Sequence, residues 1–259
     1  MKVAITGKGG VGKTTLASLL ARLYAADGMN VLAIDANPDA NLGMALGLPA
    51  EQARLITPIA EMEDLIEERT GARPGSQGAF FTLNPRVDDI PERFSARVDG
   101  VRLLVMGAVK KGGGGCMCPE SALLKGLMNH LLLRESDVVI MDMDAGMEHI
   151  GRGTAAAVDA FIVVVEPGRR SLQTAQAIRQ LARDIGVEKC YAVGSKAQGE
   201  ADRQFIREGA GDFEVLGFIS YNPEIIEADR KGVSVFEAAP QAVADARAIK
   251  EKLDSEVRR

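Results

Sequence analysis

An octapeptide at residues 7–14 constrains the fold of this chain more than any other segment. It matches the pattern G-x-x-x-x-G-K-[ST] and reads Gly7-Lys8-Gly9-Gly10-Val11-Gly12-Lys13-Thr14. In such loops backbone N–H groups converge on phosphates, the last lysine reaches the β- and γ-phosphates and the hydroxyl binds Mg²⁺. An apolar run at 2–6 precedes the loop, and leucines at helical spacing follow it over 16–23. The alternative is a chance glycine-rich turn. Because the full motif lies between an expected strand and an expected helix, we expect a nucleotide site instead.

The loop contains one lysine more than the pattern requires. Lys8 stands at its second position, whereas Lys13 is the lysine of the motif. A lysine there is typical of the deviant Walker A, or MinD-like, class of P-loop NTPases, which this sequence resembles. The resemblance implies that Lys8 reaches across a homodimer to the partner's nucleotide, so that Lys8 and Lys13 both act in catalysis. The nucleotide-binding residues expected in this segment are Gly9, Gly10, Val11, Gly12, Lys13, Thr14 and Thr15.

Apolar strands alternate with helical patterns along the rest of the chain. The expected strands cover 30–34, 101–105, 137–141, 160–165, 190–193 and 215–218, and the expected helices cover about 120–134, 170–185, 198–208, 223–231 and 239–257. This alternation predicts an α/β fold with a mostly parallel sheet buried by helices on both faces. The 259 residues fit a single P-loop ATPase domain over 1–259, with an irregular insertion at about 73–100.

Charge and composition exclude several classes of partner. The net charge of −5 gives no electrostatic footprint for nucleic acid. No apolar run is long enough to span a bilayer, and the N-terminal segment has the pattern of a core strand. We therefore expect a cytoplasmic protein with no nucleic acid and no membrane partner. Three cysteines without a secretory signal favour metal binding or redox chemistry over disulfides.

Two further segments carry carboxylates that complete an NTPase site. Asp35 follows the second strand, in a stretch where the deviant Walker A class usually reads D-x-D-P; this chain has Asn37 in place of the second aspartate. An amide is not a base, so we expect Asp39 to position the attacking water and Asp35 to lie nearer the Mg²⁺. Alternatively, Asp39 caps the short helix that follows. Asp142 ends an apolar strand in the Walker B manner and should approach Mg²⁺ together with Thr14.

The residues after 142 and the expected adenine pocket are less regular. The stretch 143–149 resembles the second switch of the class; His149 there could bind metal or be an ordinary loop histidine. The class usually places an Asn-Lys pair after the strand at 190–193, and here Ser195 and Lys196 take that place. The stretch 217–224 resembles the loop that covers the base. These features favour ATP over GTP.

A C-x-C loop at about 108–119 suggests what the nucleotide serves. Four glycines precede Cys116, and Pro119 starts a helix with Cys118 at its N-cap. The helix N-terminus and the lysines at 110–111 should lower the pKa of the Cys118 thiol, and two thiolates on one side of an extended segment suit Ni²⁺, Zn²⁺ or Cu⁺. The alternative is that both cysteines are small apolar loop residues. Cys190 lies in an apolar strand and should belong to the core.

Two thiolates do not complete a tetrahedral site. A two-fold axis would bring Cys116 and Cys118 of two chains together, which agrees with the dimer implied by Lys8; histidine or water could instead complete the site within one chain. Together the motifs resemble nickel-insertion ATPases of carbon monoxide dehydrogenase maturation, the CooC type. That resemblance implies slow ATP hydrolysis coupled to nickel transfer into a client metalloenzyme, carbon monoxide dehydrogenase or acetyl-CoA synthase.

Three other functions stay open at this point. An electron-transfer or cluster-carrier protein like the nitrogenase iron protein could hold an iron–sulfur cluster between four thiolates. That family usually draws its cysteines from two separated loops. A membrane-positioning ATPase would need a basic amphipathic tail with large apolar residues, whereas residues 246–254 mix both charges. A metal store without turnover is the third.

Overall fold

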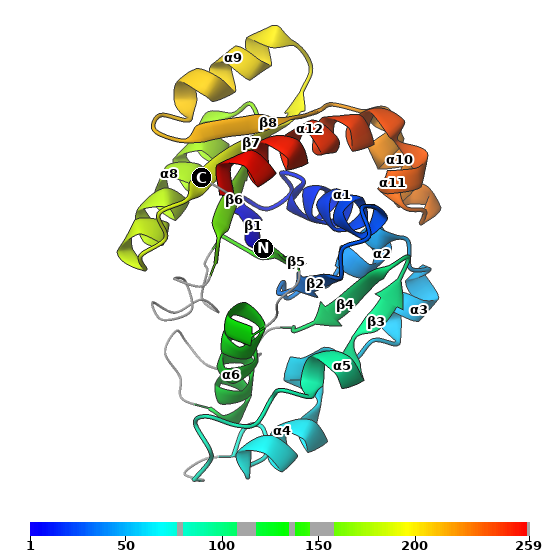
Figure 1. Cartoon of the computed structure of the whole chain (residues 1–259), viewed down its shortest axis with the longest axis vertical. Coiled ribbons are helices and arrows are strands. Elements are labelled where there is room, and N and C mark those ends of the chain that lie inside the picture. The colour runs from blue at the N-terminus through cyan, green and yellow to red at the C-terminus, as the bar shows by residue number, and fades with distance from the viewer. Residues whose placement is uncertain (77–79, 108–117, 135–137, 146–157, 258–259) are drawn as a thin grey trace.

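The computed structural model describes residues 1–76, 80–107, 118–134, 138–145 and 158–257. An eight-stranded sheet runs through it in the order β3-β4-β2-β5-β1-β6-β7-β8, and only β3 is antiparallel to its neighbour (Figure 1). The strands are β1 Lys2–Gly7, β2 Val31–Asp35, β3 Ala96–Val98, β4 Val101–Val105, β5 Val138–Asp142, β6 Ala160–Val165, β7 Cys190–Ala197 and β8 Glu214–Ser220. The predicted α/β fold with a mostly parallel sheet is confirmed.

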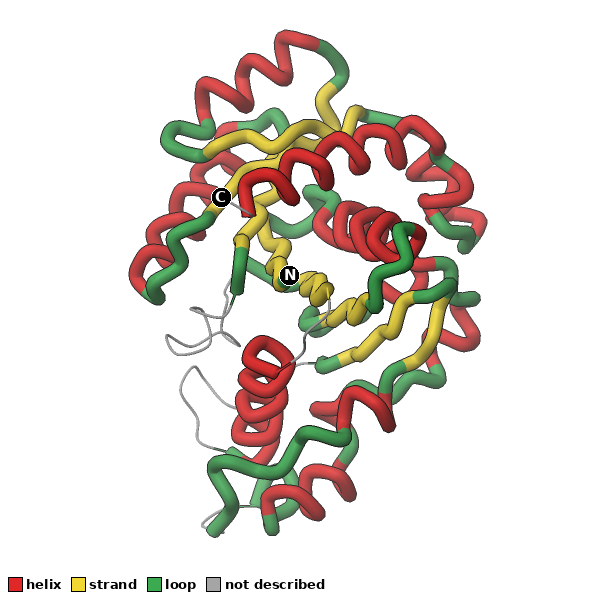
Figure 2. The backbone as a smooth tube through the Cα atoms, in the orientation of Figure 1, coloured by secondary structure: helices red, strands yellow, loops and turns green. Residues whose placement is uncertain are grey.

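Helices lie on both faces of this sheet (Figure 2). They are α1 Lys13–Ala26, α2 Leu42–Leu46, α3 Ala50–Arg54, η1 Ile59–Glu61, α4 Glu63–Thr70, α5 Ile90–Phe94, α6 Pro119–Arg134, α8 Arg169–Asp184, α9 Glu200–Gly209, α10 Pro223–Lys231, α11 Val235–Ala238 and α12 Pro240–Val257. Each helix expected from the leucine and alanine spacing is present within two residues of its predicted ends, because the periodicity reports the buried stripe directly.

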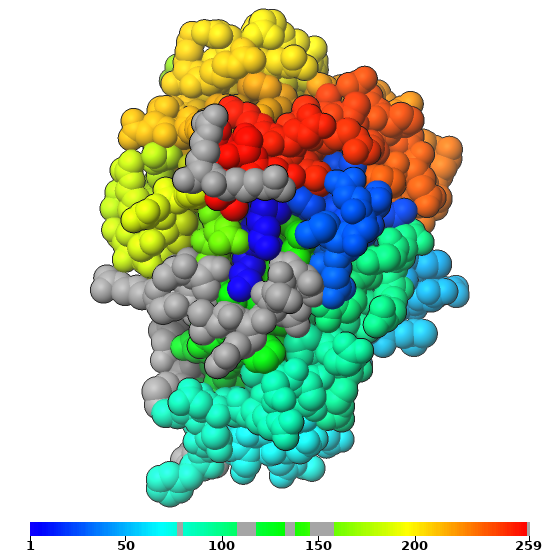
Figure 3. All heavy atoms as spheres, in the orientation of Figure 1, coloured from blue at the N-terminus to red at the C-terminus, as the bar shows by residue number. Residues whose placement is uncertain are grey.

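The core consists of two apolar layers separated by the sheet. One layer joins α1, α2, α11 and α12 to the strands, with Leu20 and Ile249 fully buried. The other joins α4, α6, α8 and α9, with Leu127 and Ile178 buried in it. The central strand β1 is buried from Val3 to Gly7, as a parallel strand covered on both faces requires. In Figure 3 the red of α12 lies against the blue of α1, and the two helices are in contact.

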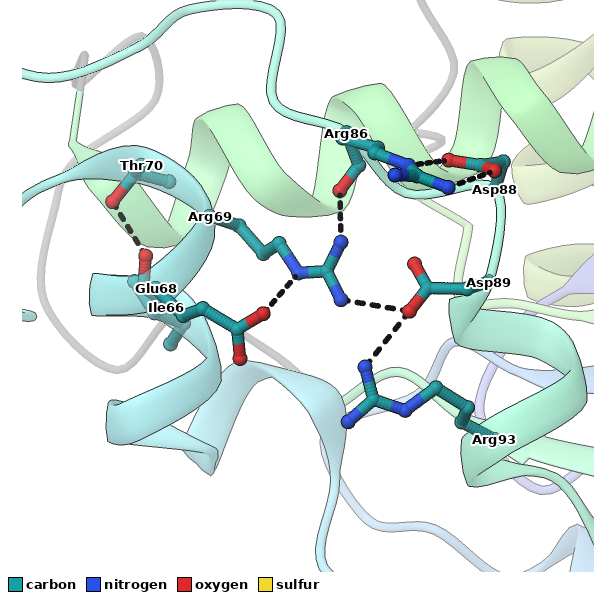
Figure 4. Close-up of polar contacts among 8 residues, drawn as sticks. All are labelled: Ile66, Glu68, Arg69, Thr70, Arg86, Asp88, Asp89 and Arg93. Atoms are coloured by element: carbon teal, nitrogen blue, oxygen red, sulfur yellow. Dashed lines mark hydrogen bonds and ion pairs between the residues drawn. The ribbon is translucent and has the colours of Figure 1, made fainter.

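The stretch 73–100, expected to be an irregular insertion, contains the short helix α5 and the edge strand β3. β3 pairs antiparallel with β4 across a turn in which Asp99 has a φ of 44°. An ionic cluster joins α4 to the chain around α5: Arg69 donates to Asp89 at 2.8 Å, and Arg93 donates to the same carboxylate oxygen at 2.8 Å (Figure 4). Charged side chains thus fix elements that have no strong apolar periodicity.

The functional residues expected from the sequence gather at the carboxyl edge of the parallel strands. Asp35 and Asp142 end β2 and β5 and are paired in register. In the neighbouring β1, Ile5 is the residue paired with Asp142, and the strand ends two residues later at Gly7. Ligands of open α/β sheets bind at this edge. No helix in the described part of the chain is long and apolar enough to cross a membrane.

Candidate functional site

The loop between β1 and α1 is held open by glycine conformations. Gly10 and Gly12 have φ of 77° and 99°, in the region that favours glycine. At Gly7, with φ of 146°, an added Cβ would lie 2.5 Å from the Val164 carbonyl oxygen, so only glycine allows β6 to approach this closely. Apart from the adjoining residues of the chain, no heavy atom in the described ranges lies within 4 Å of a Cβ placed on Gly9 or Gly10. The loop therefore leaves room on that side for a ligand against its backbone, which fits a phosphate group.

Thr14 and Asp142 meet directly below this loop. The Thr14 hydroxyl donates to Asp142 Oδ2 at 2.6 Å, which joins the first turn of α1 to the end of β5. Burial raises the pKa of Asp142 to about 7, and the neighbouring Asp35 adds to the increase, although the Thr14 hydroxyl opposes it. Because burial disfavours the charged form, this carboxyl group is suited to a cation that restores the charge balance.

Asn37 occupies the space between Asp35 and Asp142. Its side-chain amide donates to Asp35 Oδ1 at 3.1 Å and to the backbone carbonyl oxygen of Asp142 at 3.3 Å. Asp35 is fully buried, and its carboxylate also accepts from the backbone N–H groups of Asn37 and Leu42. Burial raises the pKa of Asp35, while these hydrogen bonds lower it. Asp35 therefore organises the loop that follows β2.

Two buried oxygens at this point have no hydrogen-bond donor within the described residues: Asn37 Oδ1 and Asp142 Oδ1. A buried acceptor without a partner is unfavourable, and such atoms call for a water or an ion. Together with the Thr14 hydroxyl they form an all-oxygen donor set, the kind that Mg²⁺ prefers. The residues present therefore fit a magnesium ion beside the phosphate loop.

Asp39, the expected water-positioning residue, is exposed in the loop between Asp35 and α2. It does not cap the helix, since α2 has Asn41 at its N-cap and no side-chain cap. Asn41 instead donates from its side chain to the Asp39 backbone carbonyl at 3.1 Å. The carboxylate is therefore available to a ligand or a water at the sheet edge.

Lys13 lies under the loop, with only 8% of its side chain exposed. Its Nζ is 3.5 Å from Asp144 Oδ1 and donates to the Lys8 backbone carbonyl at 3.4 Å. Thr6 also donates to the Asp144 carbonyl, at 3.0 Å. A phosphate group in the loop would compete with Asp144 for Lys13, so the segment after β5 is tied to the state of the nucleotide site.

Ser195 and Lys196, the residues expected at the nucleotide base, lie beside the phosphate loop. Ser195 is buried, and its hydroxyl oxygen is 3.1 Å from the position of a Cβ on Gly12. Lys196 donates from Nζ to the Gly10 carbonyl at 2.6 Å and is 3.6 Å from Glu166 Oε2. Lys8, the surplus lysine, is 3.5 Å from the other oxygen of Glu166. One carboxylate thus lies between the partly exposed Lys8 and the exposed Lys196.

Only part of the C-x-C loop can be placed. Cys116, both lysines at 110–111 and His149 lie outside the described residues. Cys118 precedes α6, and its carbonyl accepts from Ala122 N–H at 3.0 Å, which confirms it as the N-cap. The expectation of a lowered thiol pKa is wrong for this conformation: burial raises the pKa of Cys118, and the nearby Glu120 adds to this. Its thiol contacts the Ser121 hydroxyl at 3.1 Å.

No group of three or more potential metal-ligating side chains from His, Cys, Asp and Glu is assembled within the described ranges. A metal site at Cys118 therefore needs ligands from residues such as Cys116 or from a second chain. Sequence reasoning missed Asp144 and Glu166 as contacts of the loop lysines. It named Asp144 only as part of a switch, and a single glutamate after an apolar strand carries no recognisable pattern.

Comparison with known proteins finds related sequences over most of the chain. Residues 2–235 match the model of the CobQ/CobB/MinD/ParA nucleotide binding domain. The chain is 48% identical over 240 residues to the carbon monoxide dehydrogenase accessory protein CooC of Rhodospirillum rubrum, covering 93% of this chain and 91% of that protein. It is 43% identical over 235 residues to an uncharacterized ATP-binding protein of Methanocaldococcus jannaschii, covering 90% of each.

Solved structures share the architecture at low sequence identity. A chain of the MinC:MinD cell division protein complex of Aquifex aeolicus superposes with a TM-score of 0.68 at 20% identity, covering 98% of this chain and 96% of that chain. A putative plasmid partition protein from Borrelia burgdorferi bound to AMPPNP gives a TM-score of 0.69 at 14% identity, covering 98% and 99%. These two similarities concern the fold alone.

Proposed function

Because the chain belongs to the CobQ/CobB/MinD/ParA family of nucleotide-binding domains, we propose that it is an ATPase that acts as a nickel metallochaperone. In this proposal the protein dimerises with ATP and metal and delivers nickel to an apo-metalloenzyme. The similarity to the carbon monoxide dehydrogenase accessory protein of Rhodospirillum rubrum supports a client enzyme of this kind. Carbon monoxide dehydrogenase, or an acetyl-CoA synthase, is accordingly the proposed client.

The observation that carries the proposal is the connection between residues 35–37 and the start of the segment that leads to the cysteines. The Met106 N–H donates to the Asp35 carbonyl at 2.8 Å, directly after β4. Asp35 in turn holds the loop of Asn37 through its carboxylate. The chain that continues from Met106 towards Cys118 therefore leaves the sheet beside the proposed Mg²⁺ site. A change in that site would therefore reach the start of the segment that leads to the cysteines through these hydrogen bonds.

In the nucleotide site each residue has a defined task. Lys13 and the backbone of Gly9, Gly10 and Gly12 would hold the phosphates, while Thr14 and Asp142 would ligate Mg²⁺ with Asp35 behind them. The ion, when bound, would neutralise negative charge on the β- and γ-phosphates. Asp39 would position the attacking water from the exposed side of the loop. Asn37 has no basic oxygen, which is consistent with slow hydrolysis.

Nickel is the cargo of the proposed reaction. Cys116 and Cys118 of two chains would supply four thiolates, a soft donor set that also accepts Zn²⁺. Burial raises the pKa of the Cys118 thiol, which favours its protonated form. Metal binding would therefore release protons, as thiolate ligation requires.

The coupling of metal to nucleotide is tested by measuring nickel affinity by competition with a chromophoric chelator. We expect a difference in affinity between protein with the nonhydrolysable analogue AMPPNP and protein with ADP. A ligand shifts an equilibrium only by binding two states differently, and the effect is reciprocal. Zinc serves as the parallel metal in the same assay. Identical nickel affinities in both nucleotide states would contradict the proposal.

The role of Lys8 is tested by comparing Lys8→Ala with Lys13→Ala. We expect Lys8→Ala to bind a fluorescent ATP analogue with nearly unchanged affinity but to stay monomeric with AMPPNP in sedimentation velocity. Lys13→Ala should lose nucleotide affinity itself, because its ammonium lies under the phosphate loop. A Lys8→Ala protein that still forms the ATP-dependent dimer would show that this lysine acts within its own chain.

A further inference from the structure

Glu166 directly follows β6, at the point where the sheet topology brings three functional segments together. β6 pairs with β1 up to Gly7↔Val164 and with β7 up to Val165↔Gly194. The first residue after β6 therefore lies between the phosphate loop that leaves β1 and the Ser195-Lys196 segment of β7. The backbone N–H of Glu166 donates to the Ser171 hydroxyl at 3.1 Å, which fixes it to the first turn of α8.

The carboxylate of Glu166 holds two lysines at once. Its Oε1 is 3.5 Å from Lys8 Nζ, and its Oε2 is 3.6 Å from Lys196 Nζ. Lys196 also donates to the Gly10 carbonyl at 2.6 Å, so the carboxylate and the loop backbone are linked through one ammonium group. Glu166 is the least exposed of the three side chains, at 28% against 41% for Lys8 and 48% for Lys196.

The backbone of Lys196 supports a positioning role for this cluster. Its φ is +58°, a conformation that is unfavourable for a residue with a side chain. Such strain persists only where surrounding contacts impose it, and it is common at ligand sites. Lys196 lies at an irregularity of the β7–β8 pairing between Ser195 and Ala197, and from this backbone conformation its ammonium contacts Gly10 and Glu166. The cluster therefore has a defined geometry although it is partly exposed.

We propose that Glu166 is a positioning residue that retains Lys8 within its own chain until nucleotide-dependent dimerisation draws that lysine to the partner's site. This inference rests on the proposed function of Lys8 across the dimer. An ammonium paired with Glu166 in one chain is not available to a phosphate in another, so dimer formation must break this ion pair. Glu166 thus opposes dimerisation in the empty protein and makes it depend on the nucleotide.

The test is the dimerisation equilibrium of Glu166→Gln at saturating AMPPNP, measured by sedimentation velocity over a range of protein concentrations. Each partly exposed ion pair is worth a factor of roughly 1.4 to 5, and a symmetric dimer loses two of them, so the dimer should form at roughly two- to thirtyfold lower protein concentration than in the wild type. Glu166→Asp, which keeps the charge on a shorter side chain, should fall between the two. The matched control is Glu214→Gln, which removes a 2.9 Å pair with Lys252 and should dimerise like wild type, because Glu214 begins β8 and so lies at the amino edge of the parallel strands, opposite the carboxyl edge.

A second experiment distinguishes an effect of Glu166 that acts through Lys8 from a general effect of removing one negative charge. If Glu166 acts through Lys8, the double variant Lys8→Ala/Glu166→Gln should stay as monomeric as Lys8→Ala alone. Restored dimerisation in the double variant, or a Glu166→Gln protein no more dimeric than wild type, overturns the inference. A wild-type protein that fails to dimerise with AMPPNP contradicts the proposed function itself. In that case both the proposal for Lys8 and the inference built on it are wrong.

Discussion

Asn37 shows how a single residue can hold an anionic site together. Its amide donates to Asp35 and to the backbone of Asp142, so it stabilises two buried acidic positions in the absence of a cation. Its own Oδ1 and Asp142 Oδ1 are left without donors in the described part of the chain. The amide therefore donates to neighbouring acceptors through its nitrogen and offers the proposed Mg²⁺ site an oxygen. An aspartate at position 37 could supply only the second of these.

Asn37→Asp should consequently destabilise the metal-free protein. The substitution removes two donated hydrogen bonds and places a third carboxyl group beside Asp35 and Asp142, which are both buried. We expect a loss of about 1–3 kcal/mol in the free energy of unfolding at neutral pH with EDTA. Mg²⁺ with AMPPNP should restore more stability to the variant than to the wild type. Urea denaturation with and without the ligand measures both quantities.

The control for this variant makes the same charge change in the same loop. Asn41→Asp adds one carboxylate at an exposed position, where the amide contacts only the Asp39 carbonyl. Its free energy of unfolding should stay within about 0.5 kcal/mol of the wild type, as surface substitutions usually do. Equal losses in both variants would mean that net charge, and not the contacts of Asn37, sets the stability of the site.

The site could be predicted from the sequence where a motif dictates the contact. The Thr14–Asp142 bond follows from the spacing of loop and strand, because both motifs end at the same sheet edge. The contacts of Glu166 could not be predicted, since they depend on which strands become neighbours of β1. The thiol pKa of Cys118 was predicted in the wrong direction, because sequence shows the helix dipole but not the burial that opposes it.

At the scale of elements, α4 and α5 depend on charged contacts that have no sequence period. Arg69, with 9% of its side chain exposed, reaches from α4 to Asp89 at the start of α5, and Arg93 binds the same oxygen (Figure 4). Apolar contacts at Leu65, Ile66 and Ile90 place these elements on the core. Strands and long helices were predictable because their periodicity is strong, whereas α4 and α5 have short patterns completed by ion pairs between distant residues.

Asp89→Asn should weaken this connection in a pH-dependent way. The guanidinium groups of Arg69 and then Arg93 hold the pKa of Asp89 well below its usual value of 3.8. The carboxylate therefore stabilises the fold fully above about pH 4, and this contribution is lost as the pH falls further. We expect the variant to lose about 1 kcal/mol at pH 7, and the difference from wild type to shrink below pH 4. Denaturant unfolding at pH 7 and from pH 5 to 3 measures it.

The neighbouring Asp88 provides the comparison for Asp89. Asp88 pairs with Arg86, whose side chain is 74% exposed, and contacts neither Arg69 nor Arg93 in the cluster drawn in Figure 4. Asp88→Asn should therefore leave the free energy of unfolding nearly unchanged at pH 7. If the two variants were equally unstable, local charge around α5 and not the link between α4 and α5 would explain the effect.

At the scale of the whole molecule, the proposed metal site and the proposed function of Lys8 require the same two-fold symmetry. Lys8 directly follows β1, at the carboxyl edge of the sheet. Cys118 directly precedes α6, in the connection that leaves the same edge after β4. A dimer formed over that edge would bring both pairs of residues towards the axis. Two incomplete sites in each chain would then be completed by one association, which is the physical basis that we propose for coupling ATP to nickel.

Metal stoichiometry in mixed dimers tests this symmetry. With AMPPNP, wild-type protein should bind one nickel ion per two chains. Heterodimers of a tagged wild-type chain with a Cys118→Ala chain lack one direct ligand and should bind nickel more weakly. Losing only a hydrogen-bonding partner of a metal ligand lowers metal affinity roughly 10- to 100-fold, so we expect a larger decrease here. Cys190→Ala is the matched control: burial raises the pKa of that thiol to about 11, and it starts β7 against the core. Heterodimers that keep wild-type affinity would place the complete site within one chain.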